Sequence, residues 1–287
     1  MRPFTLVLVV PLVSCVGAQS GAAERVEAGP DTFAQVDEAR GMVADATHVL
    51  VDLRPPAEYR TGHAPGAVNL DIGALRAEVE GVPGQLAPRP RLAAALAAAG
   101  IDVGDAILAI DAEAGPPAAR LLWTLQSFGH APEKLRLLDG GWAAWVAAGG
   151  PQSVEPGVPV GGEAPLGAEV PELRVDAAWV QAHLADPAVL LLDVRGDEEW
   201  AAGRIPGAQH VPWQDARASD GRLLPEEKLR ELYARALSTP TVAVYCASGM
   251  RASVIWLVLR TLGHSDVRVY DGSWNEWGAR PDLPKEL

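Results

Sequence analysis

The sequence predicts an α/β fold of two tandem domains, each a mostly parallel sheet flanked by helices. Short apolar runs alternate with helical patterns in both halves of the chain, which favours parallel strands joined by crossover helices. Part of the first half recurs in the second half, and a stretch rich in Gly and Pro separates the two copies. The length of 287 residues is enough for about two such domains.

The N-terminal segment, up to the start of domain one, is interpreted separately from the domains. A short apolar run follows Arg2, as in a signal peptide, and it ends in the letters LVSC, which resemble the lipobox of bacterial lipoproteins. We expect a signal peptide over residues 1–14, lipidation of Cys15 and a tether over residues 15–31. Plain cleavage near Ala18 is the alternative. The protein would then be exported to the periplasm, with the lipid as its only link to a membrane.

The repeat is the strongest sign of domain organisation. Asp52, Arg54 and Glu58 recur as Asp193, Arg195 and Glu199, all at one constant offset along the chain. A second motif, LLDGGWAAW, recurs near the C-terminus as VYDGSWNEW. A period this long indicates duplicated domains and not a solenoid. We place domain one at residues 32–148, the linker at 149–173 and domain two at 174–287.

The secondary structure of domain two follows from its apolar spacing and its stop signals. Residues 252–262 place Ile255, Trp256 and Leu259 on one helical face, and Gly263 provides the stop. The other elements expected are a helix capped by Asp176 and ending at Leu184, a strand 189–193, a helix 226–237, a strand 241–245 and a strand 267–270.

Cys246 stands at the carboxyl end of the predicted strand 241–245. It is one of two cysteines, so it is the only thiol left if Cys15 is lipidated or removed. Gly249 permits positive φ in the following loop, whose N–H groups can form an anion-binding nest. Arg251 adds a cation, and together these groups would stabilise a thiolate. The alternative is a buried structural cysteine ahead of a helix.

Three motifs in order resemble those of rhodanese sulfurtransferases of the two-domain form. They are D-V-R-x-x-x-E-W-x-x-G-x-I-P-G-A, then C-x-x-G-x-R after a strand, then Y-D-G-S-W-x-E-W, within about residues 32–280. The resemblance implies two tandem rhodanese-like domains and a Cys246 persulfide. It also implies a small sulfur-containing anion as donor, thiosulfate or 3-mercaptopyruvate, and cyanide or a thiol as acceptor, with no cofactor and no metal. The substrate-binding loop would consist of Ala247, Ser248, Gly249, Met250 and Arg251.

Asp193 and Arg195 are expected to support that loop. We expect Arg195 to pair with Glu199 and fix its own loop, because the equivalent residues also occur in domain one. Asp193, at the end of a strand that faces the site, would help to position the sulfur-carrying loop. Trp274 is expected in the core and not in the cleft.

Domain one is expected to be inactive. Asp111 follows its strand 106–110 where domain two has Cys246, and the next loop is one residue longer. Pro116 and Pro117 remove two amide donors from that loop, so we expect it to lack the donors of a persulfide site.

Charge and spacing bear on other classes of function. The net charge of −13 argues against nucleic acid as a partner, which needs a basic face. The six His residues show no metal-ligand spacing. A cysteine phosphatase needs C-x5-R, whereas Cys246 and Arg251 form C-x4-R. A non-enzymatic persulfide carrier or sulfide sensor at the membrane is the other alternative.

Overall fold

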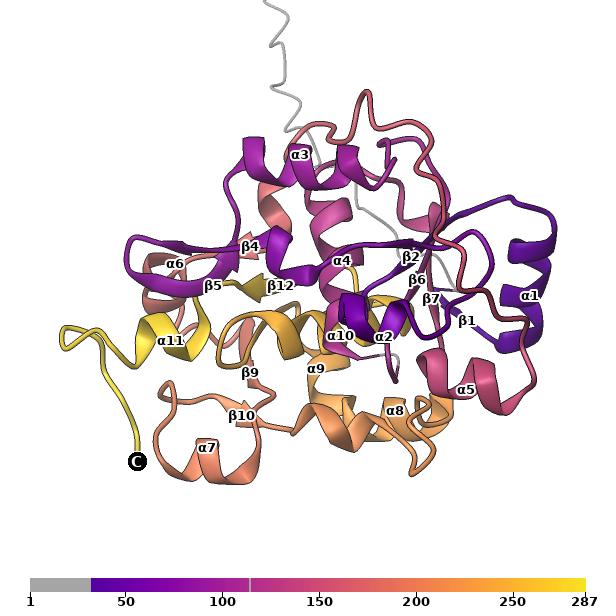
Figure 1. Cartoon of the computed structure of the whole chain (residues 1–287). Helices are drawn as coiled ribbons and strands as arrows, with labels where there is room; N and C mark the ends of the chain where they lie inside the picture. Colours follow the sequence, from indigo (N-terminus) through magenta and orange to yellow (C-terminus); the bar gives the residue numbers. More distant parts are fainter. Residues whose placement is uncertain (1–31, 114) are drawn as a thin grey trace, which may run out of the picture.

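The computed structural model of the chain describes residues 32–113 and 115–287. The predicted signal peptide, Cys15 and the tether lie outside these residues, so the lipid remains a prediction. Within the described ranges, no helix combines the length and the apolar character needed to cross a bilayer. The described chain forms two five-stranded sheets and one two-stranded sheet, with helices covering the larger sheets (Figure 1).

The sheet of domain one has the strand order β1-β7-β6-β2-β3, and all of its pairs are parallel. Its central strands are almost wholly apolar because helices bury both faces. The elements are β1 (Phe33–Ala34), α1 (Val36–Ala44), β2 (Val49–Asp52), α2 (Pro56–Tyr59), β3 (Val68–Asn69), η1 (Ile72–Leu75), β4 (Arg76–Val79), β5 (Val82–Leu86), α3 (Arg89–Ala98), β6 (Ile107–Ile110), α4 (Pro116–Ser127), η2 (Pro132–Lys134), β7 (Leu135–Leu138) and α5 (Gly141–Ala147).

The sheet of domain two repeats this order as β10-β9-β11-β12-β8, again with parallel pairs only. The strands predicted at 189–193, 241–245 and 267–270 are confirmed at these bounds. The elements are η3 (Pro171–Leu173), β8 (Arg174–Val175), α6 (Ala177–Ala182), β9 (Val189–Asp193), α7 (Asp197–Ala201), β10 (Gln209–His210), η4 (Trp213–Ala216), α8 (Glu226–Leu232), α9 (Ala234–Ser238), β11 (Thr241–Tyr245), α10 (Met250–Thr261), β12 (Val267–Tyr270) and α11 (Ser273–Trp277).

Three helix predictions in domain two need correction. The helix capped by Asp176 ends at Ala182 and not at Leu184. The helix expected over 226–237 is two helices, because the backbone of Tyr233 leaves the α region at φ −103° and ψ 21° while its ring is buried. The helix expected over 252–262 begins earlier, at Met250. The cap on α6 is confirmed, since the Asp176 carboxylate accepts the Trp179 N–H at 2.8 Å.

The two domains share one continuous core. Helices α4 and α10 pack against each other, and one apolar cluster extends from the inner face of the first sheet to that of the second. This explains why α10 is buried on nearly all sides and not only on the predicted face: Val254, Leu257 and Val258 are covered as well. Two smaller clusters lie on the outer faces of the sheets.

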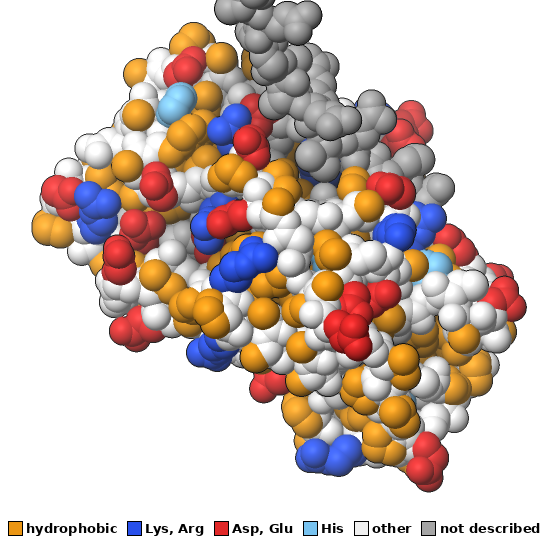
Figure 2. All heavy atoms as spheres, turned by 90° about the horizontal axis from the view of Figure 1, so that it is seen from above, with side chains coloured by type: hydrophobic (Ala, Val, Ile, Leu, Met, Phe, Trp, Pro, Cys, Tyr) orange, Lys and Arg blue, Asp and Glu red, His pale blue; other side chains and the backbone are white. Residues whose placement is uncertain are grey.

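The segment between the domains lies along domain one and is hydrogen-bonded to it. Ser153 exchanges two backbone hydrogen bonds with His63, at 2.8 and 2.9 Å. Further along, the Gly162 N–H donates to the Asp102 carboxylate at 2.9 Å. The Gly- and Pro-rich composition therefore provides a strap of irregular backbone over one domain. Figure 2 shows the molecule from above, with acidic and basic side chains interspersed on that face.

Candidate active site

Cys246 directly follows β11 at the edge where the strands of domain two end. Its side chain is fully buried and its thiol is free. The preceding residue, Tyr245, lies in register with Asp193 of the neighbouring strand β9. Gly249 then turns the chain at φ +76° and α10 begins. The predicted order of strand, cysteine, tight loop and helix is confirmed.

The hydroxyl group of Ser273 is hydrogen-bonded to this loop. Ser273 Oγ accepts the N–H groups of Cys246 and Gly249 at 3.2 and 3.1 Å, and it donates to the Tyr270 carbonyl at 2.7 Å. Within the described chain, no hydrogen bond uses the N–H groups of Ala247 and Ser248. These two donors therefore remain for an anion carried on Cys246. Ser273 lies in the repeated D-G-S-W motif, but its contact with the loop could not be read from the motif.

Arg251, in the first turn of α10, is held by Glu199. Its two terminal nitrogens donate to the two carboxylate oxygens of Glu199 at 2.5 and 2.7 Å. The Glu199 carboxylate raises the pKa of Arg251 above its ordinary value, and the nearby Cys246 sulfur adds to this. The predicted pair of Arg195 with Glu199 is therefore wrong, because Arg251 takes the Glu199 carboxylate.

Arg195 pairs with Asp193 instead. Its Nε lies 3.0 Å from both carboxylate oxygens, Nη2 lies 2.6 Å from one of them, and the same Nη2 donates to the Gly203 carbonyl at 2.7 Å. The guanidinium also lies 4.6 Å from the ring centre of Trp274, and the backbone N–H of Trp274 donates to the Cys246 carbonyl at 3.0 Å. Arg195 is thus a buried brace behind the loop, and Trp274 packs over it with part of its surface exposed.

Domain one supplies a further cation that the sequence did not reveal. Its β4–β5 hairpin reaches toward β12 and α11 of domain two (Figure 1). Arg76, at the start of the hairpin, donates to Ser248 Oγ at 3.0 Å, and Asn275 donates to the Pro83 carbonyl at 3.3 Å. The approach is close: a Cβ added to Gly84 would lie 2.9 Å from the Ser248 Cβ.

A buried ion pair joins the two domains beneath the loop. Arg120 of α4 donates to Asp271 at 2.5 Å, and the other Asp271 oxygen accepts the Leu86 N–H at 2.8 Å. Nε and Nη1 of Arg120 have no partner among the described residues, although the side chain is fully buried. A Cβ on Gly249 would lie 2.6 Å from Nη1, so this guanidinium packs against the Cys246 loop. Burial lowers the pKa of Arg76, and the charge of Arg120 lowers it further.

Asp111 occupies the equivalent position in domain one. Its carboxylate accepts the N–H groups of Glu113, Gly115 and Ala118 at 3.2, 2.7 and 3.0 Å. The expectation that Pro116 leaves this loop without donors is therefore wrong, because three other amides point inward. The domain-one nest exists, and the side chain of Asp111 itself fills it. Burial raises the pKa of this carboxyl group.

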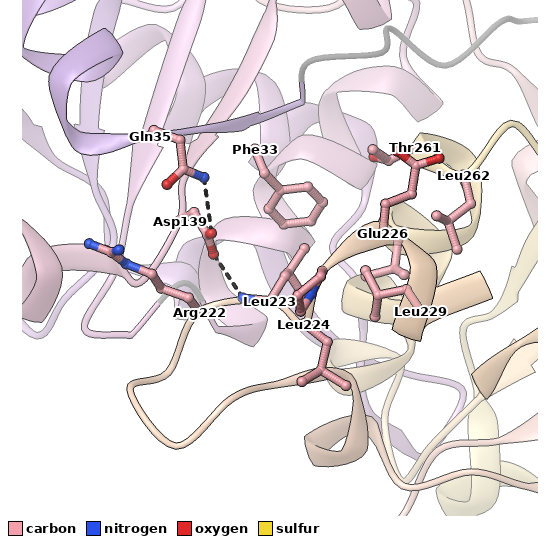
Figure 3. A pocket seen from close by; sticks show the side chains of 12 residues that line it. Phe33, Gln35, Asp139, Arg222, Leu223, Leu224, Glu226, Leu229, Thr261 and Leu262 are labelled. Atoms are coloured by element: carbon pink, nitrogen blue, oxygen red, sulfur yellow. Dashed lines mark hydrogen bonds between the residues drawn. The ribbon is translucent and has the colours of Figure 1, made fainter. Parts of the chain in front are cut away.

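The groove in Figure 3 is a separate feature. It lies between the domains, has a volume of about 470 Å³, and is lined by Phe33 and Asp139 of domain one and by Leu223 and Leu229 of domain two. No residue of the 246–251 loop lines it. Within the described chain, no group of three or more His, Cys, Asp or Glu residues could hold a metal ion.

Comparison with known proteins agrees with this geometry. A profile of the "Rhodanese-like domain" matches residues 35–148 and 176–280. The chain belongs to the rhodanese family. It is 34% identical over 244 residues to the 3-mercaptopyruvate sulfurtransferase of Escherichia coli, covering 80% of this chain and 85% of that protein. It is 30% identical over 249 residues to the thiosulfate sulfurtransferase of Pseudomonas aeruginosa, covering 83% of this chain and 91% of that protein.

Solved structures of the protein EanB have the same fold. A variant of EanB with hercynine superimposes with a TM-score of 0.79 at 25% sequence identity, covering 92% of this chain and 70% of EanB. Another EanB structure holds ergothioneine covalently linked to a persulfide cysteine. The present chain is a rhodanese-family sulfurtransferase with two tandem domains.

Proposed function

We propose that the protein transfers a sulfane sulfur from thiosulfate to a thiophilic acceptor through a persulfide on Cys246. The observation that supports this most strongly is a free, buried cysteine at a strand end, with two unused loop N–H groups and the Arg251 guanidinium around it. Three guanidinium groups, of Arg76, Arg120 and Arg251, surround the loop. Asp271 pairs with Arg120 and Glu199 pairs with Arg251, so the described residues leave one net positive charge, that of Arg76, which favours an anionic donor.

The first half-reaction is a displacement at sulfur. The Cys246 thiolate attacks the outer sulfur of thiosulfate, a new S–S bond forms, and the old S–S bond breaks with its electron pair leaving on sulfite. The loop N–H groups and Arg251 stabilise the negative charge that now sits on the persulfide. In the second half-reaction, cyanide or a thiolate attacks the outer sulfur, and the Cys246 thiolate is restored.

Thiosulfate is preferred over 3-mercaptopyruvate in this proposal because of the proton balance. Sulfite leaves thiosulfate as an anion and needs no proton, whereas breaking the C–S bond of 3-mercaptopyruvate creates a carbanion that must be protonated. The guanidinium group of Arg76 contacts Ser248 and that of Arg251 lies near Cys246; both stay protonated at neutral pH and donate poorly as acids. These cations suit the sulfite leaving group better.

The test is persulfide formation followed by turnover. We expect the intact protein to gain about 32 Da, the mass of one sulfur atom, after thiosulfate treatment, and to lose it on addition of cyanide. Cys246→Ser should show no gain, while Asp111→Ser, the matched change in domain one, should leave the persulfide on Cys246. Steady-state rates with both donors then decide donor preference. Loading without turnover would support the carrier function instead, and loading of the Cys246→Ser protein would refute the proposal.

A further inference from the structure

The contact between Glu199 and Arg251 has no role in the chemistry described so far. Both carboxylate oxygens are used by the two terminal nitrogens of Arg251, in the bidentate geometry that a guanidinium also forms with oxyanions. One carboxylate oxygen also accepts the Gly196 N–H at 3.2 Å, which fixes the carboxylate at the start of α7. The Glu199 side chain keeps 40% of its surface exposed, so the pair lies at the rim of the site.

The same Arg251 also faces the sulfur. The sulfur of Cys246 is close enough to raise the pKa of Arg251 together with Glu199. Arg251 therefore has a resident carboxylate bonded to it and the Cys246 sulfur close by. A donor oxyanion that binds to Arg251 has to share its charge with Glu199 or displace it.

We propose that Glu199 is a resident counter-anion that limits how tightly the site binds the anionic donor and the sulfite product. With Glu199 in place, the charge of Arg251 is largely balanced, so sulfite is released readily after the first half-reaction. Glu199 is a specificity-determining residue here and not a catalytic one, because it acts through Arg251. This inference rests on the proposed function only in the identity of the donor.

Charge predicts a graded effect. Removing one negative charge near the site lowers the energy of a bound dianion by about twice as much as that of a monoanion. For Glu199→Gln, we expect KM to fall roughly tenfold for thiosulfate and about threefold for 3-mercaptopyruvate. The inhibition constant of sulfite should fall with them. The value of kcat should stay level or decrease, because product leaves more slowly.

The chain offers matched controls for this experiment. Glu58 stands at the same motif position in the domain-one copy of the repeat, and among the described residues it forms no ion pair like that of Glu199. Glu58→Gln should leave KM and the inhibition constant unchanged. Glu199→Asp keeps the charge and should stay close to the parent protein in KM. High salt should reduce the gap between Glu199→Gln and the parent, since Glu199 is partly exposed.

The decisive measurements are the separate changes in KM and in kcat, and sulfite binding measured directly by calorimetry. Tighter sulfite binding with no gain in kcat supports the inference. Unchanged or weaker sulfite binding in Glu199→Gln refutes the inference, and so does an equal change in KM for both donors. Glu199 would then only hold Arg251 in position. Sulfite binding needs no turnover, so a parent protein that binds sulfite but transfers no sulfur would contradict the proposed function alone.

Discussion

At the scale of single residues, the site depends on Ser273, whose backbone adopts a conformation that serine disfavours. Ser273 is fully buried and has φ +51°, in the left-handed region where side chains other than Gly are uncommon. The matching position in domain one is Gly141, at φ +57°. This position is therefore a glycine in domain one, where the equivalent loop has no cysteine, and a serine in domain two, where its hydroxyl is hydrogen-bonded to the Cys246 loop. Three hydrogen bonds of that hydroxyl, two accepted and one donated, hold the backbone in this strained conformation.

Substitutions at Ser273 should separate the strain from the hydrogen bonds. Ser273→Ala keeps the strained backbone and leaves two buried N–H groups without an acceptor, so we expect a loss of about 1–3 kcal/mol in the free energy of unfolding. Ser273→Gly loses the same bonds but relaxes the turn, and should be about 1 kcal/mol more stable than the Ala variant. Denaturant unfolding measures both. Persulfide loading should decrease in both variants, and full loading in either would show that the loop holds its shape without the hydroxyl.

The Glu199–Arg251 pair predicts a pH dependence of stability. Hydrogen bonds from Arg251 lower the pKa of Glu199 from its ordinary value of 4.5 in the folded state. The pair therefore stabilises the fold above that ordinary value, and this contribution is lost as the pH falls through the lowered pKa. Because the carboxylate is partly exposed, the contribution is only about 0.5–1 kcal/mol. Unfolding free energies of the parent and Glu199→Gln should differ by a constant amount from pH 8 to 6 and converge below about pH 4; a constant gap down to pH 3 would argue against it.

At the scale of elements, the sequence predicted what local pattern determines. Strands 189–193 and 241–245, the Asp176 cap and the Cys246 loop follow from short-range spacing and from the repeat. The errors came from tertiary contacts. Arg195 has four acidic residues within four positions in the sequence. Only the fold shows that Asp193 pairs with it and that Glu199 pairs with Arg251 of the next strand–helix unit. The break at Tyr233 and the full burial of α10 likewise depend on what packs against them.

The buried ion pair between Arg120 of helix α4 and Asp271 gives a prediction at this scale. Arg120→Met leaves Asp271 buried without its cation, and breaking a buried pair in this way should cost about 3–5 kcal/mol of unfolding free energy. The double variant Arg120→Met with Asp271→Asn removes the unpaired charge while an amide oxygen can still accept the Leu86 N–H. It should therefore recover part of the loss, measured by denaturant unfolding. Equal stability of the single and double variants would show that Asp271 is not the source of the penalty.

At the scale of the whole molecule, each domain reaches into the loop of the other. Arg76 and Arg217 occupy equivalent positions in the two copies of the repeat, and each directly follows a 3-10 helix. Arg76 donates to Ser248 in the Cys246 loop, and Arg217 donates to the Glu113 carbonyl in the Asp111 loop at 2.5 Å. Asp271 accepts the Leu86 N–H, and Asp139 accepts the Leu223 N–H at 3.1 Å. The two domains thus dock reciprocally while only domain two has a cysteine among the described residues, so domain one contributes contacts to the Cys246 loop.

The β4–β5 hairpin provides the test of this shared site, because it contains two glycines in the same backbone region. Gly84 and Gly81 have φ +87° and +81°, so an added methyl group strains the backbone alike at both positions. At Gly81 a Cβ would meet nothing within 4 Å, whereas at Gly84 it would lie 2.5 Å from an Arg76 nitrogen and 2.9 Å from the Ser248 Cβ. Both Ala variants should lose about 1 kcal/mol of unfolding free energy from the backbone.

Only Gly84→Ala should also change catalysis, since it must push Arg76 and the hairpin away from the sulfur-carrying loop. We expect kcat/KM for thiosulfate to fall at least tenfold in Gly84→Ala, mainly through KM, because loss of a charge-assisted contact costs roughly 1.5–3 kcal/mol. Gly81→Ala should keep the kinetic constants of the parent, which makes it the control for strain in the hairpin. Steady-state kinetics of the folded variants, with stability measured in parallel, decide the matter. Equal kinetics in the two variants would mean that domain one covers the Cys246 loop without taking part in donor binding.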